Sequence, residues 1–191
     1  MGPFTEELSF EVIWKPFFLN PTLSKAVPLV QHLSNLYGAD AAASIVKPTS
    51  RLSRDGAEVG IQFNPNRLIV NTLKSHCMLD YAKTEGKQNL LAEQLFHAFF
   101  EEATNIDSDD DLAKIAVEIG LNWDAAQKHM KEVRSRVQGE AMKAREDGIR
   151  GVPYITIYVK GGQNIYLSGA QPPEEFVKVF RRLLAQLKAS A

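Results

Sequence analysis

The sequence predicts an α/β protein in which strands from both ends of the chain flank a long helical segment. Apolar and polar residues alternate near the N-terminus and again after residue 153, whereas apolar residues recur at helical spacing between about residues 22 and 146. Because neither a lone strand nor a lone hairpin is stable, the strands at the two ends are expected to share one sheet.

Length and composition exclude several classes of function. The chain has 191 residues, of which 45% are hydrophobic and 24% charged, enough for a full hydrophobic core. Its formal net charge is -1, so no global field would recruit nucleic acid or an anionic membrane. No apolar run reaches the roughly 18 residues that span a bilayer, and the first residues do not resemble a secretory signal. We therefore expect a cytoplasmic protein with no nucleic-acid and no membrane partner.

The first strand is expected over about residues 8–14, where Phe10, Val12 and Trp14 fall on one face. Pro16 ends it, because a proline has no N–H to donate to a central ladder.

The middle of the chain is predicted to be helical, because apolar residues recur there every three or four positions. Pro28 is expected to kink the first helix or to lie in the first turn of a second piece. Residues 48–66 are less regular, which indicates a connecting loop with a short extended piece. The expected helices cover about residues 23–36, 39–47, 68–85, 91–99, 112–119 and 123–144.

A glycine-flanked Val152-Pro153 leads into the second strand, expected over residues 154–159. Residues 160–164 are expected to form a hairpin turn, residues 165–168 its partner strand, and residues 172–187 a final helix. A proline at the head of a strand marks a turn-like entry where a cis bond is tolerated, and an ordinary edge-strand start is the alternative.

Cys77 is the only cysteine, which rules out an internal disulfide or a thiolate-only metal site within one chain. It shares a helical stripe with Val70, Leu73 and Tyr81, which predicts a buried structural thiol. No metal site and no catalytic residue is therefore predicted. The histidines show no metal-ligand spacing with one another or with Cys77. They are His32, His76, His97 and His129.

Several segments, taken in order, carry a resemblance to known proteins: residues 10–17, residues 19–21, Asn71 and Thr72 with His76, Gly148 and Ile149, Gly151 to Pro153, and residues 168–172. Together they resemble the DsbA family of thioredoxin-like domains, and its FrnE-like subgroup most closely. The resemblance implies a thioredoxin-like sheet with a large all-helical insertion. Residues 1–21 and 147–191 would form the thioredoxin-like domain, and residues 22–146 the insertion.

The resemblance implies that Val152-Pro153 is the cis-proline loop, which in relatives offers backbone hydrogen bonds to a substrate chain or to glutathione. A peptide, a thiol substrate or glutathione is thus the expected partner, and no other cofactor is expected. For His76, a satisfied structural histidine is the alternative. The implied binding residues are Gly151, Val152, Pro153, Asn71, Thr72, His76 and Trp14.

The sequence departs from the family at its start. Relatives begin with a strand that runs into Cys-x-x-Cys at a helix N-terminus, where a thiolate forms readily. No such segment precedes residue 8, and Cys77 is no substitute, since one thiol cannot cycle between dithiol and disulfide. We therefore expect an incomplete sheet, its first strand missing, and a homodimer through the exposed sheet edge.

Three functions follow from the resemblance. A dithiol oxidoreductase would need N-terminal residues that the sequence does not contain, so the chain as it stands is expected to be inactive in dithiol exchange. A glutathione-dependent enzyme related to kappa-class glutathione transferases and 2-hydroxychromene-2-carboxylate isomerases would need a serine or cysteine in that same segment. A non-catalytic module would keep the cis-proline groove for a peptide or a protein partner.

Overall fold

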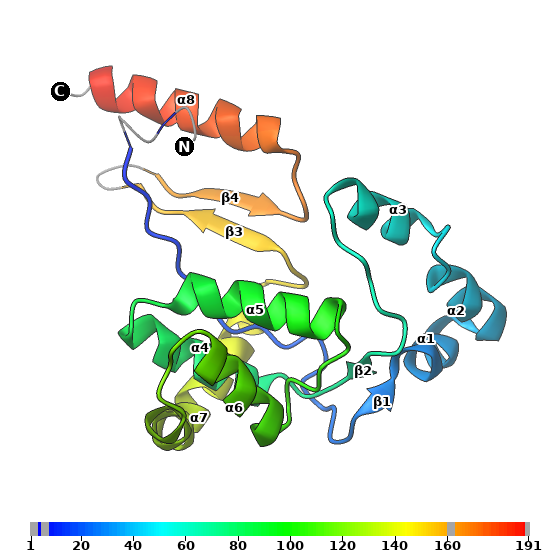
Figure 1. Cartoon of the computed structure of the whole chain (residues 1–191). Helices are drawn as coiled ribbons and strands as arrows, with labels where there is room; N and C mark the ends of the chain where they lie inside the picture. Colours follow the sequence, from blue (N-terminus) through cyan, green and yellow to red (C-terminus); the bar gives the residue numbers. More distant parts are fainter. Residues whose placement is uncertain (1–3, 5–7, 160–162, 190–191) are drawn as a thin grey trace. The chain divides into compact units, whose positions relative to one another are not determined.

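The computed structural model describes residues 4, 8–159 and 163–189 of the chain (Figure 1). The chain forms two compact units. The helical unit comprises residues Ile13–Met142, and the terminal unit comprises Met1–Val12 and Lys143–Ala191. Each unit contains both helices and strands, as expected for an α/β protein.

Four helices build the core of the helical unit. They are α4 (Leu73–Thr84), α5 (Gln88–Phe100), α6 (Asp109–Glu118) and α7 (Trp123–Glu146), whose last residues belong to the terminal unit. Each contributes apolar side chains from one stripe to a single buried cluster. The largest fully buried side chains are those of Met78, Leu91, Leu112, Val137 and Cys77.

The ends of α6 show why the helix forms where it does. Ser108 accepts a hydrogen bond from the Asp111 N–H through its hydroxyl, and the acidic first turn complements the positive end of the helix. At the other end, Lys87 Nζ donates to the carbonyl oxygens of Ile119 and Gly120. Gly120 has a φ of 67°, a conformation that favours glycine at the end of a helix.

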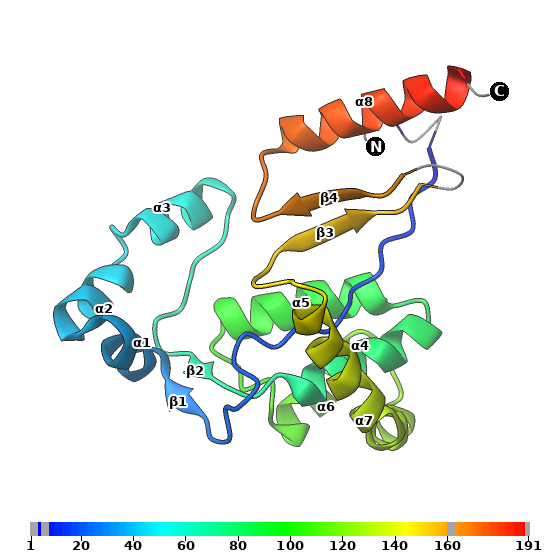
Figure 2. The ribbon, with the colours of Figure 1, turned by 180° about the vertical axis from the view of Figure 1, so that it is seen from behind.

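The first part of the helical unit is a run of short elements. They are β1 (Val27–Pro28), α1 (Leu29–Tyr37), α2 (Ala39–Ile45), α3 (Arg51–Glu58) and β2 (Leu68–Ile69). Figure 2 shows α1, α2 and α3 following one another from the β1–β2 pair. The two strands are antiparallel, with Val27 opposite Ile69 and Pro28 opposite Leu68.

Three predictions for this run were wrong. The first helix begins at Leu29 instead of Leu23, because Pro28 pairs with β2. The predicted loop over residues 48–66 contains α3, whose first turn is capped by the Ser50 hydroxyl. The helix expected from Leu68 begins at Leu73, because Leu68 and Ile69 form β2.

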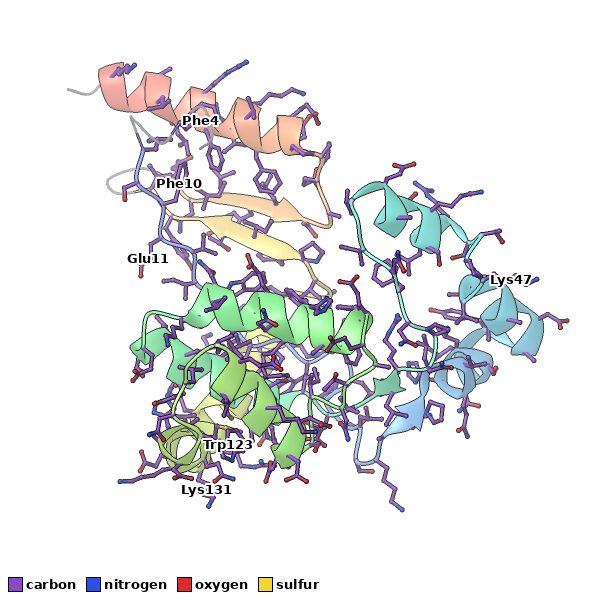
Figure 3. All side chains as sticks on the ribbon, viewed as in Figure 1. Phe4, Phe10, Glu11, Lys47, Trp123 and Lys131 are labelled. Carbon is purple, nitrogen blue, oxygen red and sulfur yellow. The ribbon has the colours of Figure 1, made fainter. Side chains whose placement is uncertain are left out.

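The terminal unit contains a β-hairpin and one long helix. Strands β3 (Tyr154–Ile157) and β4 (Ile165–Ser168) are antiparallel, and α8 (Pro173–Ala189) follows them. The predicted turn over residues 160–164 lies partly outside the described residues. Phe180 on α8 packs against Phe4 and Phe10, with ring centroids 5.7 and 4.9 Å apart, and Figure 3 labels both N-terminal rings. These contacts attach the N-terminal segment to α8.

The strand predicted over residues 8–14 is not formed, and that prediction was wrong. Within the described part of the chain the strands make two separate two-stranded sheets, β1–β2 and β3–β4, so the two ends do not share a ladder. The segment is held by other contacts: the Leu8 N–H donates to the Phe4 carbonyl, and Phe10 packs on Phe180. Alternation of apolar and polar residues indicates an extended chain, but it does not show that a partner strand is present.

Gln88 anchors the start of the helical unit to α5. The Trp14 N–H donates to Gln88 Oε1 at 3.0 Å, and Gln88 Nε2 donates to the Trp14 carbonyl at 3.2 Å. This amide pair ties the chain to α5 from Ile13 onward. The compact units divide after residues 12 and 142. The domain boundaries expected after residues 21 and 146 stay a prediction.

We predict that Gln88→Ala lowers the free energy of unfolding by about 1–3 kcal/mol, because the Trp14 backbone loses both partners at a side chain that is only 8% exposed. Urea unfolding followed by circular dichroism measures the change. Gln94→Ala on the same helix is the control. Equal stability of the two variants would show that the amide pair contributes nothing.

Candidate functional site

The residues predicted to bind a substrate fall into both units. The terminal unit holds Gly151, Val152 and Pro153, directly before β3. The helical unit holds Trp14, Asn71, Thr72 and His76.

The loop before β3 has the predicted cis bond between Val152 and Pro153. The Pro153 carbonyl accepts a hydrogen bond from the Gly169 N–H at 2.9 Å, which fixes the loop to the end of β4. The Val152 side chain is 51% exposed. The loop therefore presents an apolar side chain to solvent beside an ordered strand.

Strand β3 has one open edge among the described residues, since β4 is the strand that pairs with it there. Hydrogen-bonded pairs alternate along an antiparallel ladder, and the bond from Gly169 to Pro153 sets the phase. The backbone groups of Ile155 and Ile157 consequently face β4. Those of Tyr154 and Thr156 face the opposite edge, where they are free to pair with another extended chain.

The two faces of the hairpin differ in how exposed their side chains are, because successive side chains of a strand point to opposite faces. Ile155, Ile157 and Leu167 are half-buried on one face, whereas Tyr154 and Tyr166 are exposed on the other. The two tyrosine rings lie 6.3 Å apart. An extended chain added at the open edge would thus lie beside exposed aromatic side chains as well as free backbone groups.

His76 is held by hydrogen bonds at both ring nitrogens. Nδ1 lies 2.6 Å from the Thr72 carbonyl, and Nε2 accepts a hydrogen bond from the Phe17 N–H at 3.4 Å. This arrangement assigns the proton to Nδ1. Burial lowers the pKa of His76, and the bond to Thr72 only partly offsets that effect. The ring is therefore neutral near pH 7 and connects α4 to the N-terminal segment of the helical unit.

Asn71 organises the start of α4. Its Oδ1 accepts a hydrogen bond from the Leu73 N–H at 2.9 Å, and its Nδ2 donates to the Leu23 carbonyl at 3.0 Å. Thr72 contributes the carbonyl that His76 contacts. These bonds give both residues a structural task, and their predicted role in binding stays a prediction.

Trp14 and His76 line the same small cavity, so the structure brings these two predicted residues together. The Trp14 indole N–H donates to Asn89 Oδ1 at 2.7 Å, which fixes the ring. The cavity measures about 80 Å³. Ligand pockets measure roughly 300–1,000 Å³, so this cavity has room for a few water molecules but not for a tripeptide.

Cys77 lies in the core of the helical unit and is 1% exposed. Burial raises the pKa of its thiol to about 11, although the positive charge of Arg134 acts in the opposite direction. The predicted buried thiol is confirmed. A thiol in this state is a poor nucleophile, because the thiolate is the reactive species.

A charged cluster between α4 and α7 was missed by the sequence reasoning. Asp80 Oδ2 accepts hydrogen bonds from His129 Nε2 and from the Arg136 guanidinium, both at 2.7 Å, and Arg136 also donates to Glu140. Burial alone would raise the pKa of Asp80, but the hydrogen bonds from Arg136 and His129 outweigh it and hold the pKa below its usual value. Only the spacing of Arg136 and Glu140, four residues apart, signals the cluster in sequence.

Neither a metal site nor a membrane span is found in the described part of the chain. No group of three or more His, Cys, Asp or Glu side chains there could hold a metal ion. Among the same residues, no helix combines the length and the apolar character that crossing a bilayer requires.

Comparisons with known proteins address the fold. A family model described as a DSBA-like thioredoxin domain matches residues 5–181. The crystal structure of a probable DsbA oxidoreductase from Streptomyces coelicolor matches with a TM-score of 0.72 and 22% sequence identity, over 88% of this chain and 73% of that chain. No curated protein matches the sequence. The predicted fold class, a thioredoxin-like α/β fold with a helical insertion, is confirmed.

We predict that Cys77 in the native protein reacts with iodoacetamide at pH 8 about a hundredfold more slowly than a free cysteine, because a pKa near 11 leaves very little thiolate. Mass spectrometry of timed samples measures the rate, and the urea-unfolded chain is the control. Rapid alkylation of the native protein would contradict a buried, protonated thiol.

We also predict that Asp80→Asn lowers the free energy of unfolding at pH 7 by about 1–2 kcal/mol, because His129 and Arg136 lose a charged acceptor. The pKa of Asp80 is lowered in the folded state, so its contribution is present above the ordinary value of 3.8 and is lost as the pH falls below it. Urea unfolding at pH 7 and at pH 3 should thus show the difference shrinking in acid. A constant difference, or an equal loss in Glu132→Gln, would contradict this assignment.

Proposed function

Because the chain belongs to the family of DSBA-like thioredoxin domains, we propose that it binds extended polypeptides or peptide thiols without carrying out dithiol exchange through residues of its own. The observation that carries this proposal is the contrast between its two candidate features. The single thiol is buried and hard to ionise, whereas the backbone edge of β3 is open.

Dithiol exchange needs two thiols that form and break one disulfide, and at least one of them must ionise easily. The chain has one cysteine, and the state of Cys77 supports a structural role for it. A redox reaction would thus need thiols from outside these 191 residues. The proposed activity is recognition of the substrate chain.

Binding would proceed by addition of a strand. An extended peptide can form main-chain hydrogen bonds with an open strand edge, while pockets or exposed side chains select its alternate residues. The outward backbone groups of Tyr154 and Thr156 provide such an edge, and the exposed Val152 lies beside it. The proposed contact residues are therefore Gly151, Val152 and Pro153 together with this edge.

Two further occupants of the same edge are proposed as alternatives. Glutathione is itself a short peptide with backbone groups to share, although the small cavity beside Trp14 and His76 lends it no support. A second copy of the chain could pair edge to edge and form the expected homodimer. Assignment to the FrnE-like subgroup rests on the sequence resemblance alone and stays a proposal.

The experiment compares Thr156→Pro with Thr156→Val. Proline removes an N–H that points away from β4, whereas valine keeps the N–H and the shape of the side chain. The probe is the carboxymethylated insulin B chain with a fluorescent label, and fluorescence anisotropy measures its affinity. We predict that Thr156→Pro weakens binding about tenfold, the effect of one or two lost hydrogen bonds, and that Thr156→Val does not.

A second measurement keeps the test decisive if Thr156→Pro fails to fold. Versions of the probe peptide with N-methyl groups on alternate residues block one edge of the peptide strand at a time. One set should lose affinity and the other should keep it. The proposal would be overturned if both sets of N-methylated peptides bound equally. It would also be overturned if millimolar glutathione displaced the two sets alike, or if the chain catalysed the reduction of insulin.

A further inference from the structure

A second and larger cavity lies in the helical unit, between α5 and the loop that precedes β2. It measures about 410 Å³, within the usual range of small-molecule sites. The loop contributes Ile61 and Phe63, and α5 contributes residues that lie three or four positions apart on one face. None of the residues implicated in strand addition takes part, so the cavity is independent of the proposed function.

Aromatic rings form the walls of this cavity. The Phe100 ring lies 5.8 Å from that of Phe63 and 6.1 Å from that of Phe96, measured between centroids. These contacts hold the three rings in a fixed arrangement. The Phe96 side chain is nevertheless 47% exposed, although leaving a ring in water is unfavourable. A ligand with an apolar body would cover it.

Acidic side chains stand at the rim. Glu93 and Glu101 both line the cavity, with His97 between them. Glu101 is held in place, since its Oε1 lies 3.0 Å from His97 Nδ1 and its Oε2 accepts the Gln62 N–H at 3.1 Å. Among the described residues Glu93 forms no salt bridge. Its carboxylate is therefore available to a positively charged group.

The buried Arg67 determines which ring can bind a cation. Its guanidinium carbon lies 5.3–5.9 Å from the centroids of the Phe63, Phe99 and Phe100 rings, and the residue is 9% exposed. Arg67 does not line the cavity, so it makes no direct contact with a ligand there. Phe96 is not among these three rings. The Trp14 ring packs against it with centroids 5.5 Å apart, yet Phe96 stays 47% exposed, which leaves part of the ring for a cation–π contact with a ligand.

We propose that this cavity binds an organic cation: an ammonium group attached to an aromatic or branched aliphatic body. The apolar body packs against Phe63 and Phe100. The ammonium group lies over Phe96 and beside Glu93, where ring and carboxylate attract it together. Anions of the same shape bind more weakly, because the Glu93 carboxylate repels them.

The experiment uses benzyltrimethylammonium as the probe and phenylmethanesulfonate as its anionic counterpart, at equal ionic strength and pH 8.5. Two-dimensional NMR of the labelled full chain measures both titrations. The cation should saturate with shifts at residues of the cavity, and the anion should not. Glu93→Gln and Phe96→Leu should each weaken binding about three- to fivefold, the effect of one exposed charge or one cation–π contact.

The matched controls are Glu132→Gln on α7, which removes the same charge away from the cavity, and Leu90→Ala, which removes an exposed apolar side chain from α5 outside the lining. Both should bind the cation as the unaltered chain does. The proposal is wrong if the cation causes no saturable shifts up to 20 mM, if cation and anion bind alike, or if Glu132→Gln weakens binding as much as Glu93→Gln.

Discussion

Burial of one face of α4 is the constraint on which the rest of the helical unit depends. Met78 and Cys77 on α4 are buried in the cluster that α4, α5, α6 and α7 share. Helix α4 also carries residues that bond to the N-terminal segment of this unit and to α7. His76 holds the incoming chain through Phe17, and Asp80 holds α7 through His129 and Arg136. The same burial deprives the only thiol of water and raises its pKa.

The proposed function, binding of an extended peptide, rests on a contrast between a buried thiol and an open edge of β3. A thioredoxin-like fold can bind a substrate chain through main-chain hydrogen bonds whether or not a reactive thiol lies nearby, because the strand edge and the thiol are separate features. Here the free groups of Tyr154 and Thr156 remain, beside exposed tyrosines. The cavity bounded by Phe96 and Glu93 adds a different chemistry in the other unit, where attraction depends on side chains instead of backbone.

Sequence reasoning succeeded where the signal is local. The long amphipathic helices, the hairpin of β3 and β4, and the buried stripe of Cys77 all follow from the spacing of apolar residues, and the family resemblance led to the cis bond at Pro153. It failed where the outcome depends on contacts distant in sequence. The strand expected over residues 8–14 needed a partner that periodicity cannot reveal. The miss at α3 is of another kind, because its cap at Ser50 is a local signal three residues from Ser53 that was not used. The ion pairs of Asp80 join residues about fifty positions apart, so no local sequence motif could predict them.

The open edge of β3 is the central claim, and hydrogen exchange of its amides tests it most directly. NMR should measure exchange of the 154–157 amides in the free chain and with saturating unfolded peptide. The alternation of the ladder predicts that the Ile155 and Ile157 amides are protected in both states, whereas those of Tyr154 and Thr156 become protected only when the peptide is bound. Saturable binding of the peptide with no change at Tyr154 and Thr156 would contradict the account.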